Sequence, residues 1–401
     1  MELLNTSRIL LLLLMVTVLC TCSTKNESTS KSGASNYRLD IVDSVQVDLL
    51  AKGPQIMDVH PGTGDLLLTQ SSPPKLWIVS PNGEIKTEWA KSGNGPDEIG
   101  NALLCAEFVG DGVAMMGYMQ VKVFDKEFKT ISSYKADYSL QGMLYTGFNH
   151  LMTFKNESHL VAFTGGAQTE ARYDSPEYYN EYNVVDVIDI SESLNQETQV
   201  KGKAFKPIGK LEADSRFKTS GRAFFYIKPV FDVKNDMLIY GFNWDTTLVK
   251  RNLPTGELIS KTSIPFDQFY LNQGWTMGKA GQEMRSGNNP PRDRAGNVER
   301  VLHADGFDLI FYRSGLSLEK VNEVKLEGRE RILRLLRLDY PKYLVLQDGK
   351  RVNTELRMNR KYSTPSMADD RGYVWAAQNI NELEEEPDLI TYYKLKVVSD
   401  E

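Results

Sequence analysis

Few residue patterns in this chain indicate catalysis. The four histidines, at positions 60, 150, 159 and 303, stand far apart, and none belongs to an H-x-H, H-E-x-x-H or C-x-x-C pattern. The sequence also lacks the G-x-S-x-G elbow that would present a serine nucleophile. We therefore predict no metal site from local spacing and no cofactor, and expect the histidines to bond to neighbouring backbone.

Acidic and amide side chains could still meet through the fold. Asp58, Glu107, Asn149, Asp232 and Asp305 lie at or near short apolar stretches that we expect to be strands around a common axis. Such residues could hold a metal in a central channel, as in a metal-dependent hydrolase or lactonase-like enzyme. Three or more converging carboxylates or amides would favour this enzyme. A plugged, apolar or arginine-lined channel would favour a non-enzymatic binding module.

Two long segments suit recognition by aromatic and arginine side chains. Gly165–Asn183 contains Tyr178 and Tyr179, and Gln268–Glu299 contains Trp275. Aromatic rings give large contact areas at small entropic cost, and long loops are often functional. Packing of these rings onto the body of the protein is the alternative for both segments.

Arginines accompany Trp275 in the second segment and form a local basic group in an acidic protein. These residues are Arg285, Arg292 and Arg294. Arginine suits a carboxylate, phosphate or acidic glycan because it donates forked hydrogen bonds. The sequence therefore favours a binding module that recognises a protein, peptide or glycan, with Trp275 as its anchor.

A repeating strand pattern supplies the framework for these residues. Strands are expected at Ile56–His60, Leu66–Gln70, Lys75–Ser80 and Ile85–Trp89, with Gly-containing turns at Pro61–Asp65 and Pro81–Glu84. Four strands in 35–45 residues are typical of one propeller blade. Similar units begin at the five later positions Cys105, Leu151, Ile227, Arg300 and Ser366.

The last unit contains only three expected strands. Tyr37–Leu50 can supply the fourth by pairing beside Asp388–Val398, which predicts an all-β, six-bladed propeller closed by the two ends. Arg331–Leu338 is expected to be a strand or short helix of the fifth blade, and a basic amphipathic helix on a membrane is its alternative.

Gly93-Asn94-Gly95-Pro96-Asp97-Glu98 forms a G-x-G-P-x-E element after the first unit. This element resembles one in six-bladed β-propeller lipoproteins of Bacteroidetes, of NHL or TolB-like type, which mostly lack an assigned role. The resemblance implies the fold and a place in the cell envelope. From the residues themselves we expect a structural corner near the channel, in which Gly93, Gly95 and Pro96 shape the backbone and Asp97 or Glu98 caps free N–H groups.

The start of the chain is typical of an exported protein. Arg8 precedes the apolar run Ile9–Val16, which is too short to span a bilayer. Leu19-Cys20-Thr21-Cys22 resembles a bacterial lipobox, which implies loss of residues 1–21 and lipidation of Cys22, with Cys20 as the alternative. Residues 22–36 are polar and predict a flexible tether, so residues 37–398 would form one propeller domain attached by lipid to a membrane, the outer membrane in our interpretation.

Composition narrows the class of partner. The chain has 401 residues, of which 41% are hydrophobic and 25% charged, with a formal net charge of −6. This composition is typical of a globular protein, and the acidic balance argues against nucleic acid as a partner. If Cys22 is lipidated, Cys105 is the single cysteine of the body, so we expect a buried thiol and no internal disulfide.

Overall fold

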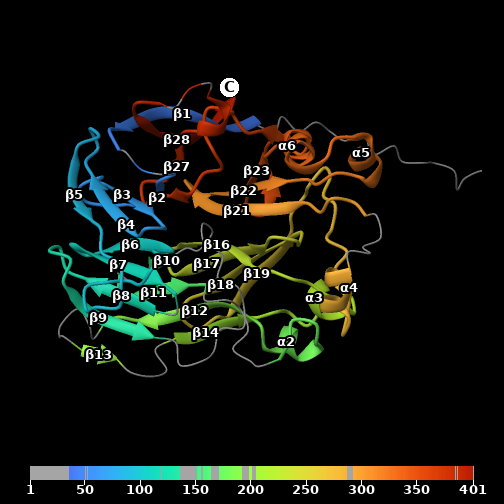
Figure 1. Ribbon diagram of the computed structural model, residues 1–401, viewed down its shortest axis with the longest axis horizontal. Coiled ribbons are helices and arrows are strands. Elements are labelled where there is room, and N and C mark those ends of the chain that lie inside the picture. Colours follow the sequence, from blue (N-terminus) through green and yellow to red (C-terminus); the bar gives the residue numbers. More distant parts are fainter. Residues whose placement is uncertain are drawn as a thin grey trace, which may run out of the picture. The chain divides into compact units, whose positions relative to one another are not determined.

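Six sheets of four or five strands, antiparallel except for one short parallel strand, form the body of the protein, which is a six-bladed β-propeller (Figure 1). The computed structural model describes residues 36–49, 51, 53–118, 120–135, 151–154, 157–163, 171–191, 198–200, 205–286, 292–383, 385 and 387–400. The predicted leader, tether and Cys22 lie outside these residues. The unit from Asn36 onward is compact, and the predicted fold class is confirmed.

Each blade begins with a short strand beside the central channel. These inner strands are β2 (Gln55–Val59), β6 (Cys105–Val109), β10 (Leu151–Phe154), β16 (Pro229–Lys234), β21 (Asn297–Ala304) and β26 (Met367–Ala368).

The second and third strands form the middle of each blade. In chain order they are β3 (Leu66–Gln70), β4 (Lys75–Val79), β7 (Gly112–Gly117), β8 (Gln120–Phe124), β11 (His159–Ala162), β12 (Asn183–Asp189), β17 (Met237–Phe242), β18 (Thr247–Asn252), β22 (Phe307–Arg313), β23 (Lys342–Gln347), β27 (Val374–Ala377) and β28 (Ile390–Asp400).

Outer strands complete the blades. They are β5 (Ile85–Trp89), β9 (Thr130–Lys135), β14 (Phe205–Lys210), β19 (Leu258–Ser263), the pair β24 (Lys350–Arg351) and β25 (Leu356–Arg357), and β1 (Asn36–Val47). A further short strand, β13 (Thr198–Val200), pairs in parallel with β9.

The chain ends close the ring as predicted. β1 lies along β28 in antiparallel register, from Asn36 opposite Asp400 to Val47 opposite Ile390. The blade order is therefore β26-β27-β28-β1, with the first strand of the chain outermost. Pairing of the two ends removes an open strand edge from the last blade.

The hydrophobic core is divided into six layers, each lying between two adjacent blades. Leu68 and Trp77 of the first blade, for example, pack with Trp375 and Tyr392 of the last. Middle strands such as β3 are buried on both faces, because a neighbouring blade covers each side. This packing explains their continuous apolar sequences, where a half-exposed strand would alternate. Cys105 is buried as expected, with 1% of its surface exposed.

Tight turns join the inner strands to the second strands on one face of the ring, which we call the turn face. The two central residues of the turns Asn235–Asp236 and Asp305–Gly306 both have positive φ, as the predicted hairpins require. Because the strands within a blade are antiparallel, the connections from second to third strand, and from each blade to the next, lie on the opposite face. We call this second face the insertion face.

The insertion face carries the helices. They are α2 (Pro176–Glu181), α3 (Arg216–Thr219), α4 (Ala280–Ser286), α5 (Leu318–Glu323), α6 (Gly328–Leu338) and the 3-10 turn η2 (Ile380–Glu382). In Figure 1, α2, α3 and α4 lie near one another, and α5 and α6 form a separate pair. Arg331–Leu338 is thus part of a helix, α6. None of the helices in the described part of the chain is long and apolar enough to cross a bilayer.

Candidate functional site

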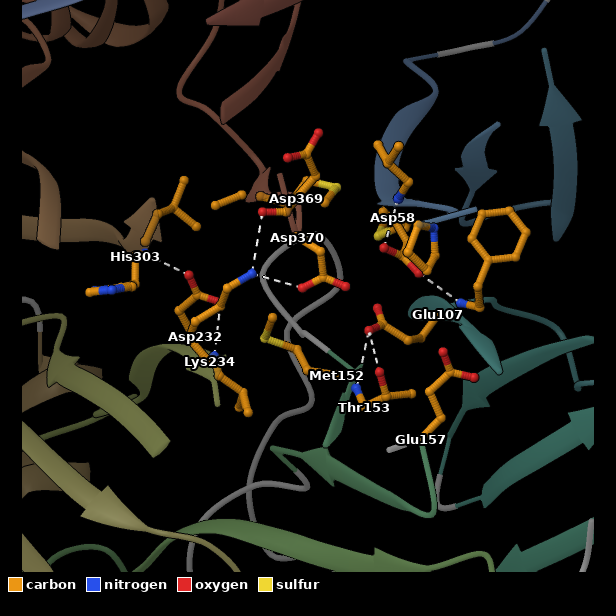
Figure 2. Close-up of a pocket in the computed structure, with 18 of the residues that line it drawn as sticks. Asp58, Glu107, Met152, Thr153, Glu157, Asp232, Lys234, His303, Asp369 and Asp370 are labelled. Atoms are coloured by element: carbon orange, nitrogen blue, oxygen red, sulfur yellow. Dashed lines mark hydrogen bonds and ion pairs between the residues drawn. The ribbon is translucent and has the colours of Figure 1, made fainter. Parts of the chain in front are cut away.

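Inner strands of all six blades surround a cavity of about 70 Å³ in the central channel (Figure 2). Turn-face residues such as Pro61 and Asp370 contribute to its wall, so the cavity lies toward that face. Six carboxylates line the cavity: Asp58, Glu107, Glu157, Asp232, Asp369 and Asp370. Three of them, Asp58, Glu107 and Asp232, were predicted to be candidates for converging groups.

Two of these carboxylates bridge neighbouring blades in the same way. Asp58 accepts one hydrogen bond from its neighbour's N–H and a second, of 2.8 Å, from the backbone N–H of Phe108 in the next blade. Asp232 accepts from the residue after it and, at 2.6 Å, from the backbone N–H of His303 in the following blade. Each carboxylate therefore joins two inner strands that have no sheet hydrogen bonds between them.

Two further contacts extend this network around and across the channel. Glu107 accepts a 3.1 Å hydrogen bond from the backbone N–H of Thr153, which links the second and third blades. Lys234 of the fourth blade donates to Asp370 of the sixth at 2.7 Å. Figure 2 shows Lys234 reaching toward Asp369 and Asp370. The polar groups of the channel thus connect the blades.

Burial makes several of these carboxylates hard to ionise. Desolvation raises the pKa of Asp58 to about 7, although two backbone hydrogen bonds oppose the shift. The same cause raises the pKa of Asp232 to about 6 and that of Glu107 well above its usual value, with the Asp58 charge adding to the rise for Glu107. Asp58 and Asp232 therefore titrate closer to neutrality than exposed aspartates do, because little water solvates them.

Three or more converging carboxylates were expected to favour a hydrolase. The number of carboxylates alone does not distinguish a catalytic site from a structural one. The six carboxylates of the cavity meet the expectation, but Asp58 and Asp232 each use both oxygens on backbone N–H groups. Asp369 likewise accepts from two backbone N–H groups and from the Trp375 indole N–H at 2.9 Å. No group of three or more His, Cys, Asp or Glu side chains among the described residues is arranged to hold a metal ion. The channel geometry therefore supports a structural role for these carboxylates.

Of the other two candidates for the channel, only Asp305 lies within the described residues, and it does not line this cavity. Asp305 occupies the turn between β21 and β22, with φ of 52°, and is exposed. Asn149 lies outside the described residues, as does His150. His303 bonds to Asp308 at 2.7 Å, and His60 accepts from the N–H groups of nearby turn residues, as expected for locally bonded histidines.

The structure places the predicted tyrosine contacts in the core. Tyr178 and Tyr179 of α2 are only 9% and 1% exposed. The Tyr179 hydroxyl donates to the carbonyl of Tyr173 at 2.7 Å and accepts from the N–H of Phe224 at 2.6 Å. Their assignment as partner contacts is therefore corrected: these rings hold the insertion onto the propeller, and a buried ring offers no surface to a partner.

Trp275, unlike the two buried tyrosines, is partly exposed. It is half-buried in β20 (Trp275–Thr276), which pairs with β15 (Arg222–Ala223). The Arg292 guanidinium lies 4.4 Å from the indole centre and also donates to the carbonyl of Gly274 at 3.1 Å. Phe225 contacts the indole edge-on at 6.2 Å. Trp275 and Arg292 thus form one partly accessible group on the insertion face.

The three arginines do not form one patch around Trp275. Arg285 is exposed in the last turn of α4. Arg294 pairs instead with Asp339 at 3.5 Å and exchanges backbone hydrogen bonds with Leu316, both in the fifth-blade insertion. Arg294 is therefore directed at the protein itself, and of the three arginines Arg285 and Arg292 remain for contact with a partner.

The G-x-G-P-x-E element forms a tight corner, as expected. The Glu98 carboxylate accepts from the N–H of Gly95 at 2.5 Å, and a Cβ at Gly93, where φ is 134°, would lie 2.3 Å from this carboxylate. Lys122 donates to the carbonyls of Gly95, Pro96 and Glu98 at 2.6–3.0 Å. Because Lys122 belongs to β8, the corner lies over the third strand of its blade. The expected position near the channel was wrong.

Exposed apolar side chains were missed by the sequence analysis and gather on the insertion face. Of the sixteen large hydrophobic residues exposed in the described structure, five lie on outer strands. The other eleven lie in insertion-face connections: Tyr118, Tyr226, Leu271, Met284, Leu326, Ile332, Leu333, Leu338, Ile380, Leu383 and Leu389. Concentration of apolar groups on one face is typical of interaction surfaces. To predict this concentration of apolar residues from the sequence, each loop would first have to be assigned to one face of the propeller.

Solved structures with the same architecture include two proteins from Bacteroides. A member of the DUF4221 family from Bacteroides vulgatus ATCC 8482 is 13% identical, with 92% of this chain and 100% of that chain covered and a TM-score of 0.60. A protein from Bacteroides fragilis NCTC 9343, named as a candidate exported protein, is 11% identical, with 90% and 96% covered and a TM-score of 0.52. At these identities the likeness shows the fold alone. No family model and no curated protein matches the chain.

Proposed function

We propose that this protein is a lipid-anchored binding module of the bacterial cell envelope that recognises a protein, peptide or glycan through its insertion face. The observation that carries this proposal is the difference between the two faces. All helices and all exposed large hydrophobic residues outside the outer strands lie in insertion-face connections of the described chain. The turn face has short hairpins and a cavity whose carboxylates bond to backbone.

The start of the propeller supports this division. Asn36, the first residue of β1, pairs with Asp400 at the end of β28, and both strand ends belong to the turn face. An anchor at Cys22 would therefore attach to that face through thirteen intervening residues, a span of up to roughly 45 Å if extended. The insertion face would then point away from the membrane and be available to partners. The candidate exported protein from Bacteroides fragilis is consistent with export of this chain.

Site-specific photocrosslinking in cells tests which face recognises partners. A benzoylphenylalanine residue would replace Leu271 or Ile332 on the insertion face, and Lys126 or Asp348 on the turn face as matched exposed controls. We expect crosslinked adducts from the first pair and none from the second. Equal adducts from both faces, or adducts from the turn face alone, would contradict the proposal.

The anchor is tested separately by labelling with radioactive palmitate. Cys22→Ala should lose the label and leave the membrane fraction, whereas Cys20→Ala should keep both. A Cys22→Ala protein that still carries palmitate would show that the anchor was assigned to the wrong cysteine.

A further inference from the structure

A second and larger hollow lies on the insertion face between the first and second blades. Its volume is about 490 Å³, within the usual range for small-molecule sites. Its floor is formed by Ala102–Leu104, and its wall by the ends of β2 and β3. Tyr118, which is 50% exposed, stands in the turn between β7 and β8. The helical insertions of the described chain belong to the third, fourth, fifth and sixth blades, so this part of the face, over the first and second blades, has no described helix of its own.

The lining of the hollow is polar but uncharged. None of its twelve described lining residues is Asp, Glu, Lys, Arg or His, although a quarter of the chain is charged. Seven of them carry hydroxyl or amide side chains: Gln55, Thr69, Gln70, Ser71, Ser72, Asn101 and Tyr118. A phosphate or carboxylate ligand would find no counter-charge here, and its desolvation would be unfavourable.

Hydroxyl and amide groups can both donate and accept hydrogen bonds. Such a lining suits a ligand whose own groups both donate and accept hydrogen bonds, as the hydroxyl groups of a sugar do. The Ser71 hydroxyl is buried and has no hydrogen-bond partner among the described residues. Because that oxygen is buried, the groups that a ligand in the hollow can reach are the exposed side chains of Gln55, Ser72 and Asn101.

The aromatic ring at the hollow completes the match. A pyranose has one face of C–H groups, which packs well on an aromatic ring, and edges of hydroxyl groups. The half-exposed ring of Tyr118 can receive the C–H face, while the exposed side chains of Gln55, Ser72 and Asn101 are available to the hydroxyls. We infer that this hollow binds one or two residues of a neutral glycan. The inference rests on the proposed binding function and narrows its ligand class.

Titration calorimetry with defined sugars tests the inference. The full chain would be purified in a detergent without a sugar headgroup. The probes are glucose, galactose, mannose, N-acetylglucosamine and their common disaccharides, with glucuronic acid, galacturonic acid and glucose 6-phosphate as charged counterparts. We expect at least one neutral probe to bind, and its charged counterpart to bind about tenfold more weakly or not at all.

Two variants locate the site. Tyr118→Ala should weaken binding of the neutral sugar about tenfold, because the stacking ring is lost, and Asn101→Ala should also weaken it, because an exposed amide of the lining is lost. Tyr226→Ala is the matched control, since Tyr226 is 41% exposed on the same face but does not line the hollow. Its affinity should stay within about twofold of the parent. Melting temperatures of the three variants would show that each is folded.

Three outcomes would overturn the inference: binding of no neutral probe, equal binding of neutral and charged probes, or equal effects of Tyr118→Ala and Tyr226→Ala. If the insertion face gives crosslinked adducts but no sugar binds in calorimetry, only the assignment of a neutral glycan is rejected. If crosslinking fails as well, the proposed binding function is lost with it.

Discussion

Replacement of Asp232 by asparagine tests whether the carboxylates between blades set the pH dependence of stability. Asp232 is 2% exposed and accepts backbone hydrogen bonds from its own blade and from His303 of the next. Burial raises its pKa from 3.8 to about 6, against the opposing effect of these hydrogen bonds and of the charges on His303 and Lys234.

The direction of the effect follows from the two protonation states. Between about pH 4 and 6 the folded protein keeps a proton on Asp232 that the unfolded chain has released. The free energy of unfolding must therefore fall as the pH rises through this range, and Asp232 should contribute nothing further above it. A shift of about two pKa units at 1.36 kcal/mol each gives an upper limit of about 3 kcal/mol. Asp58, with a pKa of about 7, acts in the same direction over a wider range.

Urea unfolding at pH 4.5, 5.5, 6.5 and 7.5, followed by tryptophan fluorescence, measures this dependence. The parent should lose stability as the pH rises, and Asp232→Asn should lose about 1–3 kcal/mol less across the range, because asparagine does not ionise. Asp305→Asn is a matched control, since Asp305 is an exposed turn residue of the adjacent hairpin. Parallel pH profiles for the parent and Asp232→Asn would refute this account of the channel.

Two further predictions concern closure of the ring and the Trp275 segment. Deletion of residues 389–401 removes β28, which lies between β27 and β1, and should abolish soluble folding as judged by expression and gel filtration; a folded monomer would contradict closure by the chain ends. Trp275→Ala should weaken partner capture by about 2 kcal/mol. It should also cost about 1–2 kcal/mol of stability in urea, less than the 3–5 kcal/mol expected for fully buried Trp77→Ala, because Trp275 is only half-buried. A loss as large as that of Trp77→Ala would make Trp275 a core residue and remove it from the binding proposal.

The blades were predictable because their signals are local. Gly-containing turns and short apolar strands define hairpins within about 40 residues, and pairs such as Asn235–Asp236 have the positive φ values that such turns require. Closure by β1 was predictable for a related reason, since the last unit lacked one strand and the first stretch of the body supplied one.

The roles of individual polar residues were less predictable. Asp58 and Asp232 could be placed near the channel, but their partners are 50 and 71 residues away along the chain. Whether a carboxylate holds a metal or bonds to a neighbouring backbone depends on the twist and spacing of two blades, which the sequence pattern does not specify. Tyr178 and Tyr179 show the same limit, because exposed and buried rings have the same appearance in a sequence.

The turn-face cavity and the insertion-face hollow differ in chemistry, and this difference bears on which substitutions should separate stability from recognition. The turn-face cavity contains carboxylates bonded to backbone, so changes there should alter folding and its pH dependence. The insertion-face hollow contains uncharged hydroxyl and amide groups, one of them a buried Ser71 hydroxyl without a partner among the described residues. Met57 contributes to both. Substitutions at Tyr118 and Asp232 should therefore have independent effects, whereas Met57 is the position at which a single change should affect binding and stability together.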